Sequence, residues 1–253
     1  MKRLMWILPV VALLLVGTGC DELIDDLTTP NVTQVAINEG AQLRLNWAPV
    51  KGAQGYKIDV DGTEYTTTET TYDVDGPAKM ITVLAYSGAS ESNKWSLNLT
   101  PVMTQTLEVW GISEPSPDNP SSFGFNTDGT ITTYSINAAN YPAMDYYMED
   151  TQLPGMNIVN PGDRGWNAKG NAAKAAGTTD FDAATIADAP GGYTTQQQLA
   201  VGGVYFLWLD RTNNNWDVTD NFAKAKVVSI QGTKVTMQVA YQKVGGLRWL
   251  KTN

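Results

Sequence analysis

The sequence predicts an all-β protein with two folded modules behind an export signal. Apolar and polar residues alternate with a period of two from Pro30 onward, and short turn-forming pairs such as Asp61-Gly62 separate the alternating runs. No sustained helical period appears between residues 30 and 253. Hydrophobic residues make up 42% of the 253 positions, which is enough to bury a core in one or two domains. We therefore expect β-strands stacked in sheets.

The first twenty residues are organised as an export signal. Met1–Arg3 carries positive charge, and Leu4–Val16 is apolar apart from Pro9. This run is shorter than the roughly 20 residues that a membrane-spanning helix needs. The small residues before Cys20 resemble the lipobox of bacterial lipoproteins, with Gly17 standing where that pattern prefers leucine. The resemblance implies removal of residues 1–19 and attachment of lipid to Cys20. The alternative is an ordinary signal peptide followed by an unmodified cysteine.

Residues 20–29 form an acidic tether, and the composition of the whole chain excludes several classes of function. Lys and Arg number 17, Asp and Glu number 26, and the formal charge is −9. Such a chain has no electrostatic attraction for nucleic acid. The absence of histidine excludes Ser-His-Asp and Cys-His catalysis and His-ligated zinc. We expect no catalytic residue, no metal and no cofactor.

The first module, residues 30–101, has the strand spacing of a β-sandwich. Alternating runs occur at residues 32–37, 42–47, 56–60, 64–67, 71–74, 81–85 and 95–99. Asp61-Gly62 suits a type I′ hairpin, in which both central residues adopt positive φ. Seven strands in about 70 residues are typical of a sandwich domain, and we expect these residues to contain its whole core.

A family resemblance supports the sandwich. Its residues are Pro30 and the segments Leu43–Pro49, Ala53–Ile58 and Ile81–Tyr86. Together they resemble a bacterial fibronectin type III domain. The resemblance implies a spacer or interaction module in which Trp47 and Tyr56 are core residues. Lys79 replaces the tyrosine expected at one corner, so we expect that corner to be held less firmly.

The second module, residues 103–253, is also predicted to be mainly β. Strand-like runs occur at residues 106–112, 122–126, 130–136, 204–209, 224–230 and 233–242. Between them, residues 154–203 are rich in Gly, Ala, Asn and Asp. We predict a long irregular excursion there, with at most a short helix in the Ala-rich residues 168–176. Long loops of this kind often carry binding sites.

Three aromatic residues are the candidate ligand-binding residues of this module. Trp166, Tyr193 and Trp216 occur in polar, turn-rich surroundings. Flat aromatic rings presented on loops can stack on sugar rings, so these residues favour a carbohydrate-binding module. The alternative is that each ring anchors its loop to the sheet.

A second, looser resemblance suggests haem capture. Asp145–Tyr147, a Gly/Asn/Ala-rich middle, Asp180–Asp182 and a last aromatic hairpin resemble in order and composition the haem-capturing β lipoproteins of the HmuY type. The best-known haem ligands of that family are histidines, which this chain lacks. Met144, Met148 and Met156 could supply thioether ligands instead, or they could fill the core.

Clustered carboxylates leave a third interpretation open. The clusters are Asp145 with Glu149 and Asp150, Asp180 with Asp182, and Asp217 with Asp220. Paired carboxylates can hydrolyse glycosides without histidine, and their oxygens can bind calcium. They also commonly cap turns and solvate loops.

These observations together favour a non-enzymatic lipoprotein of the cell envelope, anchored by Cys20 to the outer or cytoplasmic membrane. The first module would be a spacer and the second a binding domain. The expected partners are the membrane, through the lipid, and a cell-wall or surface polysaccharide or another envelope protein. We expect no nucleic-acid partner. A ligand-capture protein for haem or glycan is the alternative, and a carboxylate-dependent glycoside hydrolase is the third.

Overall fold

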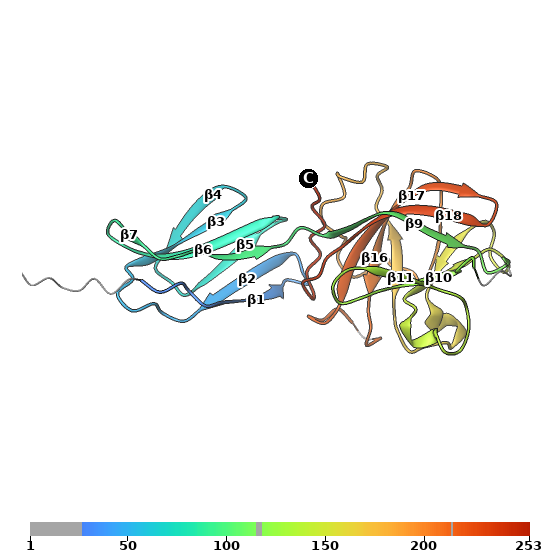
Figure 1. Ribbon diagram of the computed structural model, residues 1–253, viewed down its shortest axis with the longest axis horizontal. Helices are drawn as coiled ribbons and strands as arrows, with labels where there is room; N and C mark the ends of the chain where they lie inside the picture. Colours follow the sequence, from blue (N-terminus) through green and yellow to red (C-terminus); the bar gives the residue numbers. More distant parts are fainter. Residues whose placement is uncertain (1–26, 115–117, 214) are drawn as a thin grey trace, which may run out of the picture.

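Two β-sandwiches lie end to end in the computed structural model, which describes residues 27–114, 118–213 and 215–253 (Figure 1). The C-terminus lies near the junction between the two sandwiches. The predicted all-β fold class is confirmed. The predicted signal peptide and Cys20 lie outside the described residues.

The first sandwich, which we call the proximal domain, contains β1 to β8. These strands are β1 Val32–Ile37, β2 Gln42–Trp47, β3 Gly55–Val60, β4 Thr63–Thr67, β5 Thr71–Asp75, β6 Met80–Ser87, β7 Ser90–Glu91 and β8 Trp95–Asn98. One sheet has the order β1-β2-β5, and the other has the order β4-β3-β6, with β7 and β8 both paired to β6. All pairs are antiparallel. The seven predicted strands are present with nearly the predicted bounds, and the two-residue β7 is additional.

Asp61 stabilises two turns of the proximal domain. Asp61 and Gly62 have φ values of 50° and 89°, as the predicted type I′ hairpin requires. The Asp61 carboxylate also accepts the backbone N–H groups of Lys79 and Met80, both at 2.9 Å. Lys251 forms an ion pair with the same carboxylate at 2.8 Å. The corner that we expected to be loose at Lys79 is therefore held by Asp61.

The second sandwich, the distal domain, contains β9 to β18. Its elements are β9 Val102–Trp110, β10 Ser122–Phe125, β11 Ile131–Tyr134, η1 Tyr141–Ala143, β12 Tyr146–Glu149, β13 Asn157–Val159, η2 Pro161–Arg164, β14 Ala172–Ala175, β15 Gln196–Gln198, β16 Val204–Leu209, β17 Asn221–Gln231 and β18 Lys234–Tyr241. The two sheets have the orders β11-β10-β12-β13-β15 and β14-β16-β17-β18-β9. Apolar residues from both sheets, among them Phe123, Met148, Ile158, Val227 and Val239, form the core between them.

The predicted excursion over residues 154–203 holds more regular structure than expected. It contains the strands β13, β14 and β15 and the 3-10 helix η2. Residues 168–176, where we expected at most a short helix, contain the strand β14 instead. This strand pairs with β16, and Ala172 and Ala173 are buried. Tertiary pairing therefore overrides the helical propensity of alanine.

The proximal core includes residues from the C-terminal end of the chain. Leu247 and Trp249 belong to the hydrophobic cluster of the proximal sandwich, and Trp249 is fully buried. The Trp249 indole donates to the Ala41 carbonyl at 2.9 Å, and the Arg248 N–H donates to the Gly40 carbonyl at 3.1 Å. We call residues 247–250 the clamp segment. The expectation that residues 30–101 contain the whole core is therefore incomplete.

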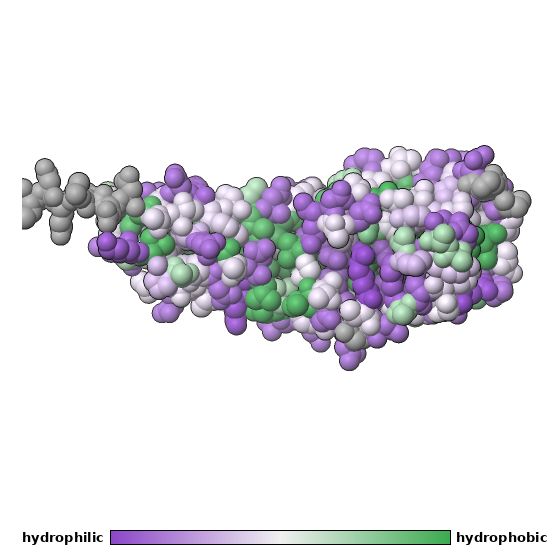
Figure 2. Space-filling model, turned by 60° about the horizontal axis from the view of Figure 1, so that its bottom comes forward, coloured by the Kyte–Doolittle hydropathy of each residue, from purple (hydrophilic) through white to green (hydrophobic). Residues whose placement is uncertain are grey.

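Backbone packing at the junction leaves no room for a side chain at Gly40. Its φ is +80°, and a Cβ there would lie 2.0 Å from the Gly246 carbonyl oxygen. Beside this contact is a groove of about 510 Å³ lined in part by Val35, Leu97 and Val218. Figure 2 shows apolar side chains on the surface where the two domains meet. The two domains are thus joined by direct packing as well as by the chain connection.

Candidate functional site

The three aromatic residues predicted as a binding surface do not form one surface. Trp166 stacks on Tyr141, with ring centroids 5.0 Å apart and an interplanar angle of 13°. Its ring also lies 4.9 Å from that of Tyr147. Tyr193 and Trp216 instead border a small cluster on the other sheet. Trp166 therefore lies against β12, apart from Tyr193 and Trp216.

Tyr193 and Trp216 are both partly buried and hold protein partners. The Tyr193 ring meets the edge of Trp208 at 5.7 Å, and its hydroxyl donates to the Asp188 carbonyl at 3.2 Å. The Trp216 indole donates to the Gly246 carbonyl at 3.0 Å and packs against the proximal core as well. These contacts are those of loop anchors.

The carboxylates of the predicted acidic clusters lie in different environments, some buried and some exposed. Asp145 is fully buried and forms an ion pair with Lys169 at 2.7 Å. Asp180 and Asp182 lie on an exposed loop, where Asp180 accepts the Asp182 N–H at 2.9 Å. The Asp150 carboxylate accepts the Ser113 N–H at 3.0 Å. Hydrogen bonds and ion pairs within the protein thus account for each of these carboxylates.

Asp217 and Asp220 lie near the domain junction. The Asp217 carboxylate accepts the Thr219 N–H at 2.6 Å. Asp220 is fully buried, and its Oδ2 accepts the Trp208 indole N–H at 3.0 Å. Burial, followed by the nearby carboxylates of Asp210 and Asp217, raises the pKa of Asp220 to about 6.

The three methionines considered as haem ligands are buried. Met144 and Met148 are fully buried, and Met156 is 7% exposed. Met148 and Met156 belong to the distal core. The thioethers of Met148 and Met156 therefore fill the sandwich interior, which is the usual role of methionine.

A pocket of about 310 Å³ lies on the outer face of the distal sheet that contains β12, β13 and β15. Tyr147, Val159 and Gln196 occupy opposed positions on these three adjacent strands. Residues opposed across antiparallel strands point to the same face, so the three side chains form a row across the sheet. Met148 and Ile158, one position along, belong to the core on the opposite face. The strand register therefore builds the base of the pocket.

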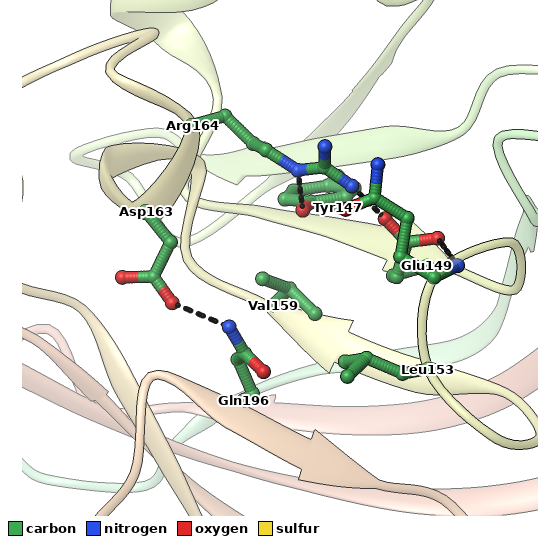
Figure 3. A pocket seen from close by; sticks show the side chains of 8 residues that line it. Tyr147, Glu149, Leu153, Val159, Asp163, Arg164 and Gln196 are labelled. Atoms are coloured by element: carbon green, nitrogen blue, oxygen red, sulfur yellow. Dashed lines mark hydrogen bonds and ion pairs between the residues drawn. The ribbon is translucent and has the colours of Figure 1, made fainter.

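Two loops raise the walls of this pocket above the sheet. The turn of η2 contributes Asp163 and Arg164, and the loop after β12 contributes Gln152 and Leu153. Asn160 fixes the start of η2, because its side chain accepts the Gly162 N–H at 3.1 Å. In Figure 3, Arg164 extends from η2 toward Tyr147 and Glu149, whereas Asp163 points from the same turn toward Gln196. The rim is therefore polar.

Glu149 and Arg164 form the most strongly connected part of the pocket. Glu149 is 1% exposed, and its Oε1 accepts the N–H groups of Thr151 and Gln152 at 2.7 and 3.0 Å. Its Oε2 accepts a guanidinium N–H of Arg164, whose Nε donates to the Tyr147 hydroxyl at 2.9 Å. Burial opposes ionisation of Glu149, but the hydrogen bonds from Thr151, Gln152 and Arg164 outweigh it and lower its pKa below the ordinary value.

Asp163 and Gln196 form the opposite side of the rim. Both side chains are exposed, and the Gln196 amide donates to Asp163 Oδ2 at 3.2 Å across the opening (Figure 3). A carboxylate offers about four acceptor sites and an amide offers both donors and acceptors. Most of their hydrogen-bonding capacity therefore remains available to a ligand.

Of the predicted aromatic residues, Trp166 lies nearest to this pocket. It does not line the pocket, but its contact with Tyr147 supports the pocket floor from outside. Arg164, Asp163 and Gln196 are not among the residues predicted from the sequence. No local pattern marks them, because the η2 turn and the register of β12, β13 and β15 bring them to the pocket.

In the described ranges, no helix is long and apolar enough to cross a membrane. The same ranges contain no cluster of three or more His, Cys, Asp or Glu side chains arranged to hold a metal ion.

The comparisons with known proteins give structural neighbours only. No family model matches the chain, and no curated protein matches it. Two solved structures of FN3tt, one of them a mutant, are each 23% identical over 28% of this chain, with a TM-score of 0.24, and the matches cover 89% and 90% of those chains. A DUF4466 family protein from Parabacteroides merdae is 10% identical over 86% of this chain and 100% of its own, with a TM-score of 0.42. The fold class described above comes from the strand order and register of this chain itself.

Proposed function

We propose that the protein is an exported, lipid-anchored protein of the cell envelope that binds a small polar ligand without transforming it. The observation that carries the proposal is the walled polar pocket on the outer face of the distal sheet. The lipobox-like residues before Cys20 support the anchor. Two acyl chains at that cysteine would hold the protein stably on a membrane.

The arrangement of the domains suits this role. The described chain begins at the end of the proximal domain that lies away from the distal domain (Figure 1). A tether leading to that end would place the proximal domain next to the membrane and the distal pocket away from it. The proximal sandwich would then act as a spacer.

The chemistry of the pocket favours binding over catalysis. A glycosidase of the usual kind needs a carboxylic acid that can donate a proton and a second carboxylate near it. Glu149 has its oxygens engaged by Thr151, Gln152 and Arg164, and its lowered pKa keeps it ionised. It is therefore suited to position Arg164 and unsuited to donate a proton. Haem capture has less support, because the methionine side chains are buried.

The anchor is tested by phase separation in detergent. The wild-type protein should partition into the detergent phase, and Cys20→Ala should remain in the aqueous phase with an unchanged melting temperature. Equal partitioning of the two proteins would remove the lipid anchor from the proposal.

The pocket is tested by a thermal-shift screen of the full-length protein against small polar ligands. A ligand that binds the native state raises its melting temperature. Gln196→Trp, which places a bulky ring at the rim, should abolish that rise. Gln198→Trp is the matched control, because Gln198 is an exposed residue of the same strand that does not line the pocket. A rise that persists in Gln196→Trp would place the ligand elsewhere.

A further inference from the structure

We infer that the ligand of the pocket formed by Tyr147, Glu149, Val159, Arg164 and their neighbours is a neutral saccharide unit. This inference rests on the proposed binding function and names the chemical class of its ligand. The pocket has charged, amide and apolar side chains within one small enclosure. Each of these features limits what can bind there.

The charge of the pocket disfavours anionic ligands. Its lining contains one guanidinium, that of Arg164, and the two carboxylates of Glu149 and Asp163. Glu149 pairs with Arg164, which leaves the exposed carboxylate of Asp163 as the charge that a ligand meets. The whole chain also has a formal charge of −9. Phosphorylated or carboxylated ligands would therefore be repelled on approach.

The hydrogen-bonding groups of the rim match a polyhydroxylated ring. Asp163 accepts hydrogen bonds, Arg164 donates them, and Gln152 and Gln196 can do both. Each of these side chains ends in a planar group with two or more polar atoms, and such a group can bridge two neighbouring hydroxyls. A sugar hydroxyl is itself both donor and acceptor. A ring with several hydroxyls can therefore engage the whole rim without bringing a net charge.

The apolar lining and the size of the pocket complete the match. Leu153 and Val159 offer apolar contact between the polar sides (Figure 3), and the C–H face of a sugar ring is apolar. The volume of about 310 Å³ lies at the lower end of the range of roughly 300–1,000 Å³ for ligand pockets. The pocket therefore has room for a single sugar unit, either free or at the end of a longer chain.

The side chains that hold the rim residues are already fixed in place by hydrogen bonds within the protein. Tyr147 and Glu149 hold the Arg164 guanidinium from two sides, and the Asn160 side chain fixes the turn that carries Asp163 and Arg164. Trp166 packs against Tyr147 from outside the pocket. Side chains that are already held in place lose little freedom on binding, which favours affinity. Tyr147 and Glu149 are thus positioning residues, while the rim residues contact the ligand.

Calorimetric titration of the purified full-length protein tests this inference. The neutral probes are the methyl glycosides of glucose, galactose, mannose and N-acetylglucosamine. The charged probes are glucuronic acid, glucosamine and glycine, which are anionic, cationic and zwitterionic. We expect at least one neutral probe to bind and glucuronic acid to show no binding.

Rim variants should locate the binding. Gln196→Ala removes neutral hydrogen bonds and should weaken the bound neutral probe about three- to tenfold. Asp163→Ala removes hydrogen bonds to a charged group and should weaken it roughly tenfold or more. Gln198→Ala, on the same strand but outside the pocket, should leave the affinity unchanged. All three substituted side chains are exposed, so the fold should be retained, which equal melting temperatures would confirm.

The remaining outcomes separate this inference from the proposed function. If no neutral probe binds but a charged probe does, and Asp163→Ala abolishes that binding, the inference of a neutral saccharide is overturned and the pocket remains a binding site. If a neutral probe binds equally well to the wild type and both rim variants, the pocket is not its site. If no probe binds, the saccharide inference fails, and the thermal-shift screen with Gln196→Trp decides separately whether the pocket binds another polar ligand.

Discussion

The proximal and distal sandwiches use the same antiparallel pairing but differ in where their core residues come from. The distal core is formed by residues of β9 to β18 and the loops between them. The proximal core combines residues of β1 to β8 with Leu247 and Trp249 of the clamp segment. A module whose own sequence contains all the strands of a sandwich can therefore still need core residues from a distant part of the chain.

The proximal domain depends on the clamp segment because of the end of its sandwich that faces the distal domain. The turn at residues 38–41 between β1 and β2 exposes backbone carbonyls, which accept hydrogen bonds from Arg248 and Trp249. Buried backbone groups need such partners. The Trp249 side chain covers apolar surface in the same place. The clamp segment thus satisfies polar groups and buries apolar ones at the same junction.

Trp249→Ala should lower the free energy of unfolding most, because it removes the core residue that the clamp segment supplies to the proximal domain. Loss of a fully buried tryptophan typically costs about 3–5 kcal/mol of unfolding free energy. We expect faster hydrogen exchange in the proximal strands β2 and β6. Phe123→Ala, a buried change in the distal core, should instead speed exchange in the distal strands. Unchanged exchange in β2 and β6 of Trp249→Ala would show that the proximal domain does not depend on the clamp segment.

Asp220→Asn should reveal how the junction responds to pH. Asp220 is fully buried, and its backbone carbonyl accepts the Gly246 N–H at 2.6 Å. Burial raises its pKa from 3.8 to about 6, so the protonated carboxyl is favoured in the folded protein. Its contribution to stability is fully present below pH 3.8, declines as the pH rises through 6 and is then lost. The loss amounts to at most about 3 kcal/mol.

Melting temperatures between pH 4 and pH 7 measure this contribution. The wild type should lose stability over that range relative to Asp220→Asn, which cannot ionise at this position. Parallel curves for the two proteins would mean that Asp220 does not titrate in this window.

Gly40→Ala should have a smaller effect confined to the junction. A Cβ at this position would lie 2.0 Å from the Gly246 carbonyl oxygen, and the positive φ adds strain. We expect a cost of about 2 kcal/mol and faster exchange of the Arg248 amide. Gly62→Ala is the matched control, because its φ is +89° but a Cβ there meets nothing within 4 Å. Equal costs for both variants would assign the effect to backbone strain alone.

The proximal strands could be predicted closely because the necessary signal is local. Alternation in Gln42–Trp47 reproduces the burial of Leu43, Leu45 and Trp47, and Asp61-Gly62 marks its own hairpin. β12 was missed, because all four of its residues are buried and its two faces show no contrast in polarity. The packing of Leu247 and Trp249 in the proximal core was missed, because the turn that Trp249 contacts at Ala41 lies about 200 positions earlier in the chain.

The sequence predicts a residue beside the candidate site but not the row of side chains that lines it. Trp166 was selected as an aromatic residue in a turn-rich loop, and it lies beside the pocket. The row of Tyr147, Val159 and Gln196 depends on the register of three strands that are separated in the sequence. No local pattern specifies that register. The predicted excursion supplies Val159, Arg164 and Gln196 to the pocket.

The clamp segment also has a consequence for the order in which the protein matures. Leu247 follows Leu99, the last residue of the proximal core within the first module, by 148 positions. At synthesis rates of about 5–20 residues per second, roughly 7 to 30 seconds separate the two. During that interval the proximal sandwich lacks Trp249 and exposes part of its core. The domain that leaves the ribosome first is therefore completed only after the strands of the distal domain have been made.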